Sequence, residues 1–188
     1  MILCNILNID GYYKGLDFTA ANNTFVNGGS KFKKFKTEII EVDGLVKVEE
    51  SLFFNKAGIN GVCKVGNNCE GTEFIADGVI NIGGMLTADN IDITLRNKCI
   101  VKEIGGEKIS IKTGKYRSRK IFGFSFSSKP MLVSEIIEGD EIFLENTHCK
   151  VVRGDKVVIG KGCTIDKVEY RTSIHINENS SVNHSISN

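Results

Sequence analysis

One short pattern recurs along the first half of this 188-residue chain: an apolar residue, then Asp or Asn, then Gly. Its five copies are Ile9-Asp10-Gly11, Val26-Asn27-Gly28, Val42-Asp43-Gly44, Ile59-Asn60-Gly61 and Ala76-Asp77-Gly78. Such a fixed spacing is typical of repeat architectures, in which one structural unit stacks on the next. We therefore expect coils of about 16–17 residues, the interval between successive copies.

Apolar residues alternate on both sides of each Asx-Gly pair. After the glycine they are Val46 and Val48, then Cys63 and Val65, then Ile80 and Ile82; before it they are Leu7, Ile40, Ala57 and Phe74. A period of two describes strands whose alternate side chains point to one interior. Gly supplies the positive φ of a tight corner between the strands. Like residues in like columns predict a parallel β-solenoid, with degenerate first coils over residues 1–37, where Tyr13, Gly15 and Ser30 interrupt the apolar columns.

An antiparallel meander is the alternative fold, because Asx-Gly between alternating strands is also a strong hairpin signal. A meander needs a second, equally regular turn between successive Asx-Gly copies. Glycines do occur there, but they do not form one fixed column. The constant spacing favours parallel stacking.

A second marker continues the pattern after residue 94. Gly106-Glu107-Lys108-Ile109 recurs at Gly139-Asp140-Glu141-Ile142 and at Gly154-Asp155-Lys156-Val157. The first interval is close to two coils and the second is close to one coil. We therefore expect a single β-helical domain over residues 1–175, interrupted by a basic and aromatic insertion at 112–134. The Asn- and Ser-rich residues 176–188 are expected to form a disordered polar tail.

Composition excludes several classes of protein. The net charge of +1 does not favour nucleic acid as a partner. The start of the chain has no signal-peptide pattern, and no stretch reaches the roughly 20 apolar residues that span a bilayer. The six cysteines form no C-x-x-C pair, so we expect no metal site and small buried thiols in a reducing, cytoplasmic compartment.

The insertion is the candidate contact site for a protein partner or for the inner face of a membrane. Its basic run leads into aromatic residues, as in segments that dock on membrane surfaces. The residues are Lys115, Arg117, Arg119, Lys120, Phe122, Phe124 and Phe126. The alternative is an irregular coil folded back on the solenoid with its Phe side chains buried.

The sequence gives little support to an enzyme. His148 and Cys149 are adjacent, and neighbouring residues on a strand point to opposite faces, so we predict no nucleophile–base pair and no catalytic residue. Nucleotide-binding glycine motifs are absent, and we expect no cofactor. The runner-up function is a hexapeptide-repeat acyltransferase on a left-handed β-helix, suggested by the local rhythm of residues 159–165. A carbohydrate-processing β-helix, which needs longer coils and a carboxylate cluster, is a third hypothesis.

From Ala76 onward the order of short glycine motifs resembles the bactofilins, in particular their longer Bacillus- and Clostridium-type members. These motifs are Ile82-Gly83-Gly84, Ile104-Gly105-Gly106-Glu107, Ile137-Glu138-Gly139-Asp140-Glu141-Ile142, Val152-Arg153-Gly154 and Ile159-Gly160-Lys161-Gly162-Cys163. The resemblance covers about residues 40–170. It implies a right-handed parallel β-helix and a cytoskeletal protein that polymerises without nucleotide. It also implies a scaffold role in cell shape, polar positioning or motility.

The ends of a solenoid expose unpaired strand edges, which must be capped or joined to another chain. Repeated end contacts produce a filament rather than a closed ring. The first residues form a poor polar cap, so we predict end-to-end self-association through Ile2, Leu3, Ile6 and Leu7. The sequence thus favours a non-enzymatic, self-associating scaffold.

Overall fold

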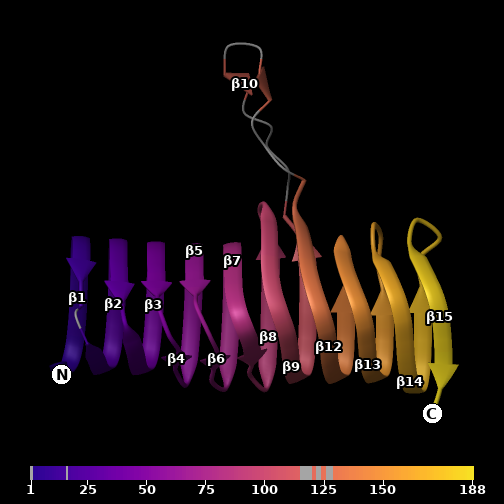
Figure 1. The fold of residues 1–188 in the computed structure, drawn as a ribbon, viewed down its shortest axis with the longest axis horizontal. Helices are drawn as coiled ribbons and strands as arrows, with labels where there is room; N and C mark the ends of the chain where they lie inside the picture. Colours follow the sequence, from indigo (N-terminus) through magenta and orange to yellow (C-terminus); the bar gives the residue numbers. More distant parts are fainter. Residues whose placement is uncertain (1, 16, 115–119, 122–123, 126–128) are drawn as a thin grey trace.

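A computed structural model describes residues 2–15, 17–114, 120–121, 124–125 and 129–188, and it shows a straight rod of stacked coils (Figure 1). The chain ends lie at opposite ends of the rod. The strands are β1 (Ile2–Lys14), β2 (Phe18–Phe32), β3 (Lys34–Val48), β4 (Leu52–Phe53), β5 (Lys56–Val65), β6 (Cys69–Glu70), β7 (Glu73–Thr87), β8 (Asn90–Leu95), β9 (Lys98–Thr113), β10 (Lys120–Ile121), β11 (Phe124–Ser125), β12 (Met131–Leu144), β13 (Thr147–Ile159), β14 (Thr164–Ile176) and β15 (Ser181–Ser187).

All pairings along the rod are parallel, and each coil pairs with the coils before and after it. The Asx-Gly copies are register partners: Gly11 lies beside Gly28, Gly28 beside Gly44, and so on to Gly78. This confirms the parallel β-solenoid and excludes the meander. The sequence period is therefore the length of one coil. Later coils depart from it slightly, being longer between β8 and β9 and shorter between β12 and β13.

The interior is filled by the predicted apolar columns. Ile40, Phe74 and Ile80 are fully buried. Cys63 and Cys99 stand in inward columns, where they replace larger aliphatic residues. Parallel stacking places these side chains directly above one another, so the core is a continuous column along the rod axis.

The first two coils complete the stack in spite of their irregular sequence. Ser30 is buried, and its hydroxyl donates to the carbonyl oxygen of Leu45 at 3.3 Å. Tyr13 is half-buried against Phe32, with ring centroids 5.4 Å apart. Because the Ser30 hydroxyl finds a hydrogen-bond partner, a polar residue is accommodated in an inward column.

Gly106 and Gly139 are only one coil apart, and the prediction of two coils between them is wrong. β12 pairs directly with β9, with Gly139 beside Gly106, just as Gly154 lies beside Gly139 on the next coil. The additional length lies between Thr113 and Met131, and its described strands, β10 and β11, are not part of the stack. In this excursion β10 and β11 pair antiparallel with each other (Figure 1). The interval between Gly106 and Gly139 is close to twice the coil period, so in the sequence it looked like two coils rather than one coil with an excursion.

The predicted disordered tail at residues 176–188 is also wrong, because β15 pairs with β14 and completes the last coil. Parallel pairing uses backbone groups that every residue here supplies. Ser180 strengthens the preceding turn: its hydroxyl donates to the carbonyl oxygen of Gly160 at 2.5 Å and accepts from the amide of Cys163 at 2.9 Å. The polar composition of residues 176–188 therefore did not prevent β15 from pairing in register with β14.

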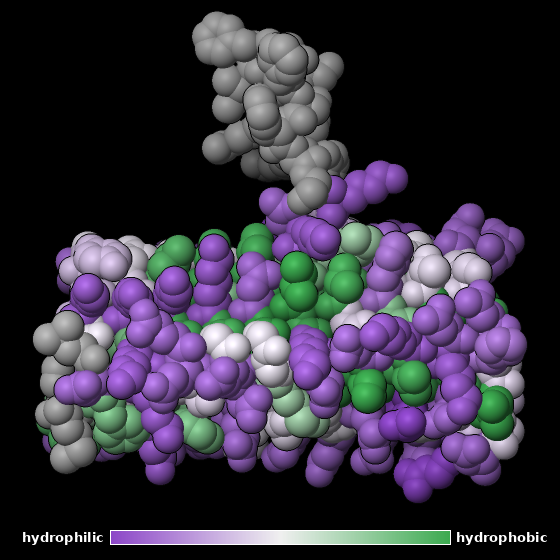
Figure 2. Space-filling view, viewed as in Figure 1, coloured by the Kyte–Doolittle hydropathy of each residue, from purple (hydrophilic) through white to green (hydrophobic). Residues whose placement is uncertain are grey.

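The described residues contain strands, turns and bends, and among them there is no helix long and apolar enough to cross a membrane. Figure 2 shows one long side of the rod, where polar side chains cover most of the surface and apolar side chains form small groups between them.

Candidate functional site

The N-terminal end of the rod carries an unpaired strand edge. Within the described residues β1 pairs with β2 alone, so its other edge, 13 residues long, has no partner strand. Leu3 and Ile6 on this strand are 66% and 59% exposed. Asp10 and Lys14 are its only charged residues. A long edge with exposed apolar side chains and few charges is a template for pairing with another chain.

The four residues predicted for self-association share this strand but differ in position. Leu3 and Ile6 are exposed, whereas Leu7 is half-buried and packs against the core. Ile2 begins the strand. Close by, the Tyr13 hydroxyl is buried without a hydrogen-bond partner among the described residues. Such a group costs about 1–3 kcal/mol, so the end coil is less well satisfied than the coils behind it.

The C-terminal end is more polar. β15 is the last strand of the sheet, and its outer edge is likewise unpaired among the described residues. Ile176 and Ile186 are 37% and 43% exposed there, among Ser, Asn and His residues. The two ends of the rod thus differ in character, with the larger apolar exposure at β1.

The basic and aromatic insertion is described only in part. Lys115, Arg117, Arg119, Phe122 and Phe126 lie outside the described residues. Lys120 belongs to β10 and Phe124 to β11. These two strands pair with each other and with no strand of the rod among the described residues. They stand away from the stacked coils (Figure 1).

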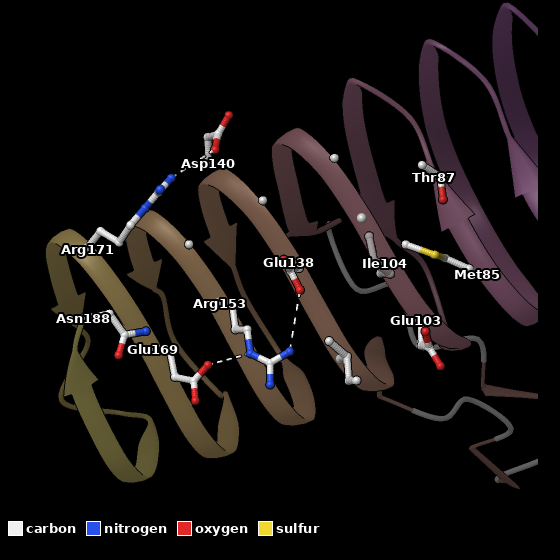
Figure 3. A pocket seen from close by; sticks show the side chains of 15 residues that line it. Met85, Thr87, Glu103, Ile104, Glu138, Asp140, Arg153, Glu169, Arg171 and Asn188 are labelled. Atoms are coloured by element: carbon white, nitrogen blue, oxygen red, sulfur yellow. Dashed lines mark hydrogen bonds and ion pairs between the residues drawn. The ribbon is translucent and has the colours of Figure 1, made fainter.

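A shallow hollow of about 670 Å³ lies on the C-terminal half of the rod (Figure 3). Backbone at Gly106, Gly139 and Gly154 contributes to its lining, where these glycines are register partners on successive coils. Charged side chains complete it. The guanidinium of Arg153 points between Glu138 and Glu169 and donates to the carboxylate of Glu169 at 2.5 Å.

Acidic and basic side chains of the hollow pair with one another. The hydrogen bond from Lys167, followed by that from Arg153, lowers the pKa of Glu169. Arg171 forms ion pairs with Asp140 and Asp155 in the same region. Carbohydrate hydrolysis needs one carboxyl group with a raised pKa beside a second carboxylate. Every resolved carboxyl shift among the described residues lowers the pKa.

The pair of His148 and Cys149 is divided between the two faces of β13. His148 is exposed, whereas Cys149 is buried and its thiol donates to the carbonyl oxygen of Val151 at 3.2 Å. Burial raises the pKa of Cys149 to about 12. A thiol in this state is a poor nucleophile. Elsewhere in the described part of the chain, no three His, Cys, Asp or Glu side chains are grouped so that they could hold a metal ion.

Sequence reasoning missed the ion pairs between coils. Arg153 meets Glu138 and Glu169 on the two neighbouring coils, and Lys156 meets Glu141 at 3.0 Å. Outward columns hold these pairs in the same way as inward columns hold the core. Opposite charges one coil period apart were the signal that could have found them.

Comparison with known proteins gives two partial matches. The chain is 40% identical over 89 residues to the uncharacterized protein YhbF of Bacillus subtilis strain 168, and 39% identical over 90 residues to the uncharacterized protein YhbE of the same strain. The matches cover 46% and 47% of this chain but 34% and 37% of the relatives. No protein-family model matches, and no solved structure matches. The chain is therefore similar, over about half its length, to about a third of two larger Bacillus proteins.

Proposed function

We propose that this chain is a non-enzymatic, bactofilin-like scaffold that associates with itself through the ends of its rod. The observation that carries the proposal is the free edge of β1, which presents exposed Leu3 and Ile6 at the end of an open parallel stack. An added copy would satisfy the unpaired backbone groups of that edge and bury the apolar side chains.

The cellular role that follows is cytoskeletal. A rod that extends by end contacts needs no nucleotide, because each contact is formed by strand pairing alone. We propose that the polymer is cytoplasmic and organises cell shape, polar positioning or motility machinery. The excursion between β9 and β12, whose strands β10 and β11 stand away from the rod, is the proposed contact with a protein partner or with the inner face of the membrane.

The chemistry of the surface supports a structural role over acyl transfer. The thiol of Cys149 is held protonated by burial, and the hollow on the C-terminal half has its carboxylates paired with basic side chains. The six-residue rhythm at 159–165 coincides with the turn between β13 and β14. It is therefore explained by local turn formation.

The test is negative-stain electron microscopy and sedimentation of the purified chain without nucleotide. Wild-type protein is expected to form filaments, and L3K/I6K is expected to remain dispersed because two lysines on the edge oppose strand addition. I75K is the matched control, since Ile75 is 52% exposed but lies in the middle of the rod. Dispersed wild-type rods, or loss of filaments in I75K alone, would refute end-to-end association.

A further inference from the structure

A shallow hollow of about 800 Å³ lies on one sheet face of the first five coils. In the third coil this face ends with Glu41, Val42 and Asp43, and the chain then turns at the corner glycine, Gly44. Val42 is buried, so Glu41 and Asp43 point outward from the same strand. Register pairing repeats this arrangement on β1, β2, β5 and β7. Every residue of the lining precedes the corner glycine of its coil, so the hollow belongs to a single face.

The floor of the hollow is partly apolar and is open at one glycine. Phe25, Glu41, Gly58 and Ile75 are register partners in one outward column. Phe25 is 42% exposed and Ile75 is 52% exposed. A β-carbon on Gly58 would have only the Glu41 Cγ nearby, at 3.9 Å, so the column has a gap between Glu41 and Ile75. Exposed apolar side chains beside such a gap, with polar groups around them, are typical of a protein contact.

The hollow is also acidic. Its charged residues are Asp10, Glu41, Asp43 and Asp77, and no lysine or arginine belongs to the lining. Arg96 pairs with Asp77 from outside the lining. Lys56 lies on the same face but pairs with Glu73 at 3.2 Å. The other three carboxylates of the lining have no ion pair in the described part of the chain. The negative charge of this hollow is therefore only partly neutralised.

These two properties select the chemistry of a partner. The carboxylates repel phosphate groups, so they disfavour nucleic acid and anionic lipid. A bare cation would leave Phe25 and Ile75 exposed to water. A protein segment with both basic and aromatic side chains meets both requirements, because it adds apolar contact to complementary charge.

This chain carries such a segment in its own excursion. Residues 115–126 contain four basic and four aromatic residues and no acidic residue. The two described strands of the excursion, β10 and β11, pair with each other and stand away from the rod (Figure 1). These strands are therefore presented to other molecules rather than to their own rod.

We propose that the hollow binds residues 115–126 of a second copy of this chain. Basic side chains of the segment meet the carboxylates of Asp10 and Asp43, and an aromatic side chain lies over Gly58. Paired strands are about 4.8 Å apart, and the carboxylate column lies about 6.6 Å along the strand from the Gly58 column, so a hairpin laid along the rod covers both columns. β10 carries Lys120 and β11 carries Phe124, so a basic and an aromatic residue lie on neighbouring strands.

Each contact of this kind is small. The hollow spans five coils, about 19 Å, and two outward columns, which gives roughly 200 Å² per partner. A stable interface needs about 800 Å² per partner. Bridges between rods therefore become strong only where many act together along a polymer. In that respect the inference rests on the end-to-end association proposed above, whereas binding of the isolated segment to one rod does not.

A fluorescent peptide of residues 115–126, titrated with the full-length chain and followed by anisotropy, measures this binding. D43K should weaken it at least about tenfold, because a carboxylate of the hollow is reversed in charge. E107K is the matched control, since Glu107 is exposed, lies outside the hollow and has no ion pair among the described residues. A peptide with Ser at its three Phe positions keeps its charge and should also bind at least about tenfold more weakly. Equal affinities for wild type, D43K and E107K would overturn the proposal.

Photo-cross-linking shows which copy supplies the segment. Phe124 is replaced by a photoreactive phenylalanine analogue in the full-length chain, and ordinary protein is mixed with isotopically heavy protein. Cross-links from position 124 to the strand that contains Gly58 are expected, with both isotopes in one product. Products of a single isotope would show that the excursion covers its own rod, and they would overturn the role of the second copy.

Two variants separate this proposal from end-to-end association. L3K/I6K should bind the peptide but form no filaments. I75K should form filaments but lose peptide binding, because Ile75 is the register partner of Gly58. Wild-type filaments without peptide binding would overturn the docking site and leave end-to-end association intact. Peptide binding without wild-type filaments would support the docking site and overturn end-to-end association.

Discussion

Gly61 lies so close to Gly44 that a β-carbon on Gly61 would overlap the carbonyl oxygen of Gly44, well inside the 3.0 Å that real β-carbons respect. Gly61 also has a φ of 137°, in a region that side chains disfavour. The same close approach recurs between Gly44 and Gly28. The corner of the solenoid therefore needs glycine for two reasons, its conformation and its spacing.

Replacing Gly61 by Ala should destabilise the rod by about 2–5 kcal/mol, from left-handed strain and from overpacking against the next coil. Gly58→Ala is the matched control, since its β-carbon would have only the Glu41 Cγ nearby, at 3.9 Å, and no positive φ. That change should be neutral or slightly stabilising. Urea denaturation of both variants measures the difference. Equal stabilities would contradict the requirement for glycine at the corner.

One of the six cysteines should react quickly with a thiol reagent in the folded protein, and the other five should react slowly. Burial raises the pKa of Cys63 to about 12 and that of Cys69 well above its usual range. Cys4 is the one thiol that is not fully buried. In native protein at about pH 8, an alkylating reagent should modify Cys4 quickly and the other five only on unfolding. Mass spectrometry of the labelled peptides measures this, with denatured protein as the control.

Acid should weaken the rod through its ion pairs between coils. Hydrogen bonds from Lys150 and Lys156 lower the pKa values of Glu135 and Glu141 below their usual value. A lowered folded-state pKa gives stability that is complete above the unfolded value and is lost as pH falls through the folded one. Urea midpoints should therefore decrease below about pH 4.5, by a small amount because the pairs are exposed. E135Q should show a shallower decrease, and high salt should reduce the effect for the wild type.

Removing the excursion should leave the rod folded. Deletion of residues 114–131 joins Thr113 to Leu132 and reproduces the connection that the next coil makes between Leu144 and Thr147. Circular dichroism and thermal melting should show an unchanged β-rich fold. Deletion of Asn146 alone is the control, because it shortens a normal connection and shifts the register of β13. A collapse of the fold on deleting 114–131 would show that the excursion supports the rod.

The stacked coils could be predicted from the sequence because corner chemistry restricts residue type. A positive φ at Gly28, Gly44 and Gly61 admits little besides glycine, so the period is visible in the sequence. The inward columns followed from it, including the buried Cys63 and Cys99. The backbone geometry thus restricts residue type at few positions, the corner glycines, but these recur at regular intervals.

Other features left no such record. The ladder between β14 and β15 is made by backbone groups, so the composition of residues 181–187 gave no sign of it. Arg153 meets Glu138 and Glu169 because they are its register partners on the two neighbouring coils; here the sequence did carry a signal, opposite charges one coil apart, but it was not used. At the rod ends, Leu3 and Ile6 were predicted for self-association, and their exposure is established while their partner remains a proposal.

The pairing of β9 with β12 has a consequence for how the rod forms. Elsewhere each strand pairs with a strand about one coil length away in the sequence. Pairing can therefore begin at any coil and extend to the next one. Between β9 and β12 the connecting chain is about twice as long, which adds ~0.7 kcal/mol to the entropic cost of closure. Strand pairing therefore slows at this one step. The strands before it and the strands after it can pair among themselves as two separate halves before the two halves join.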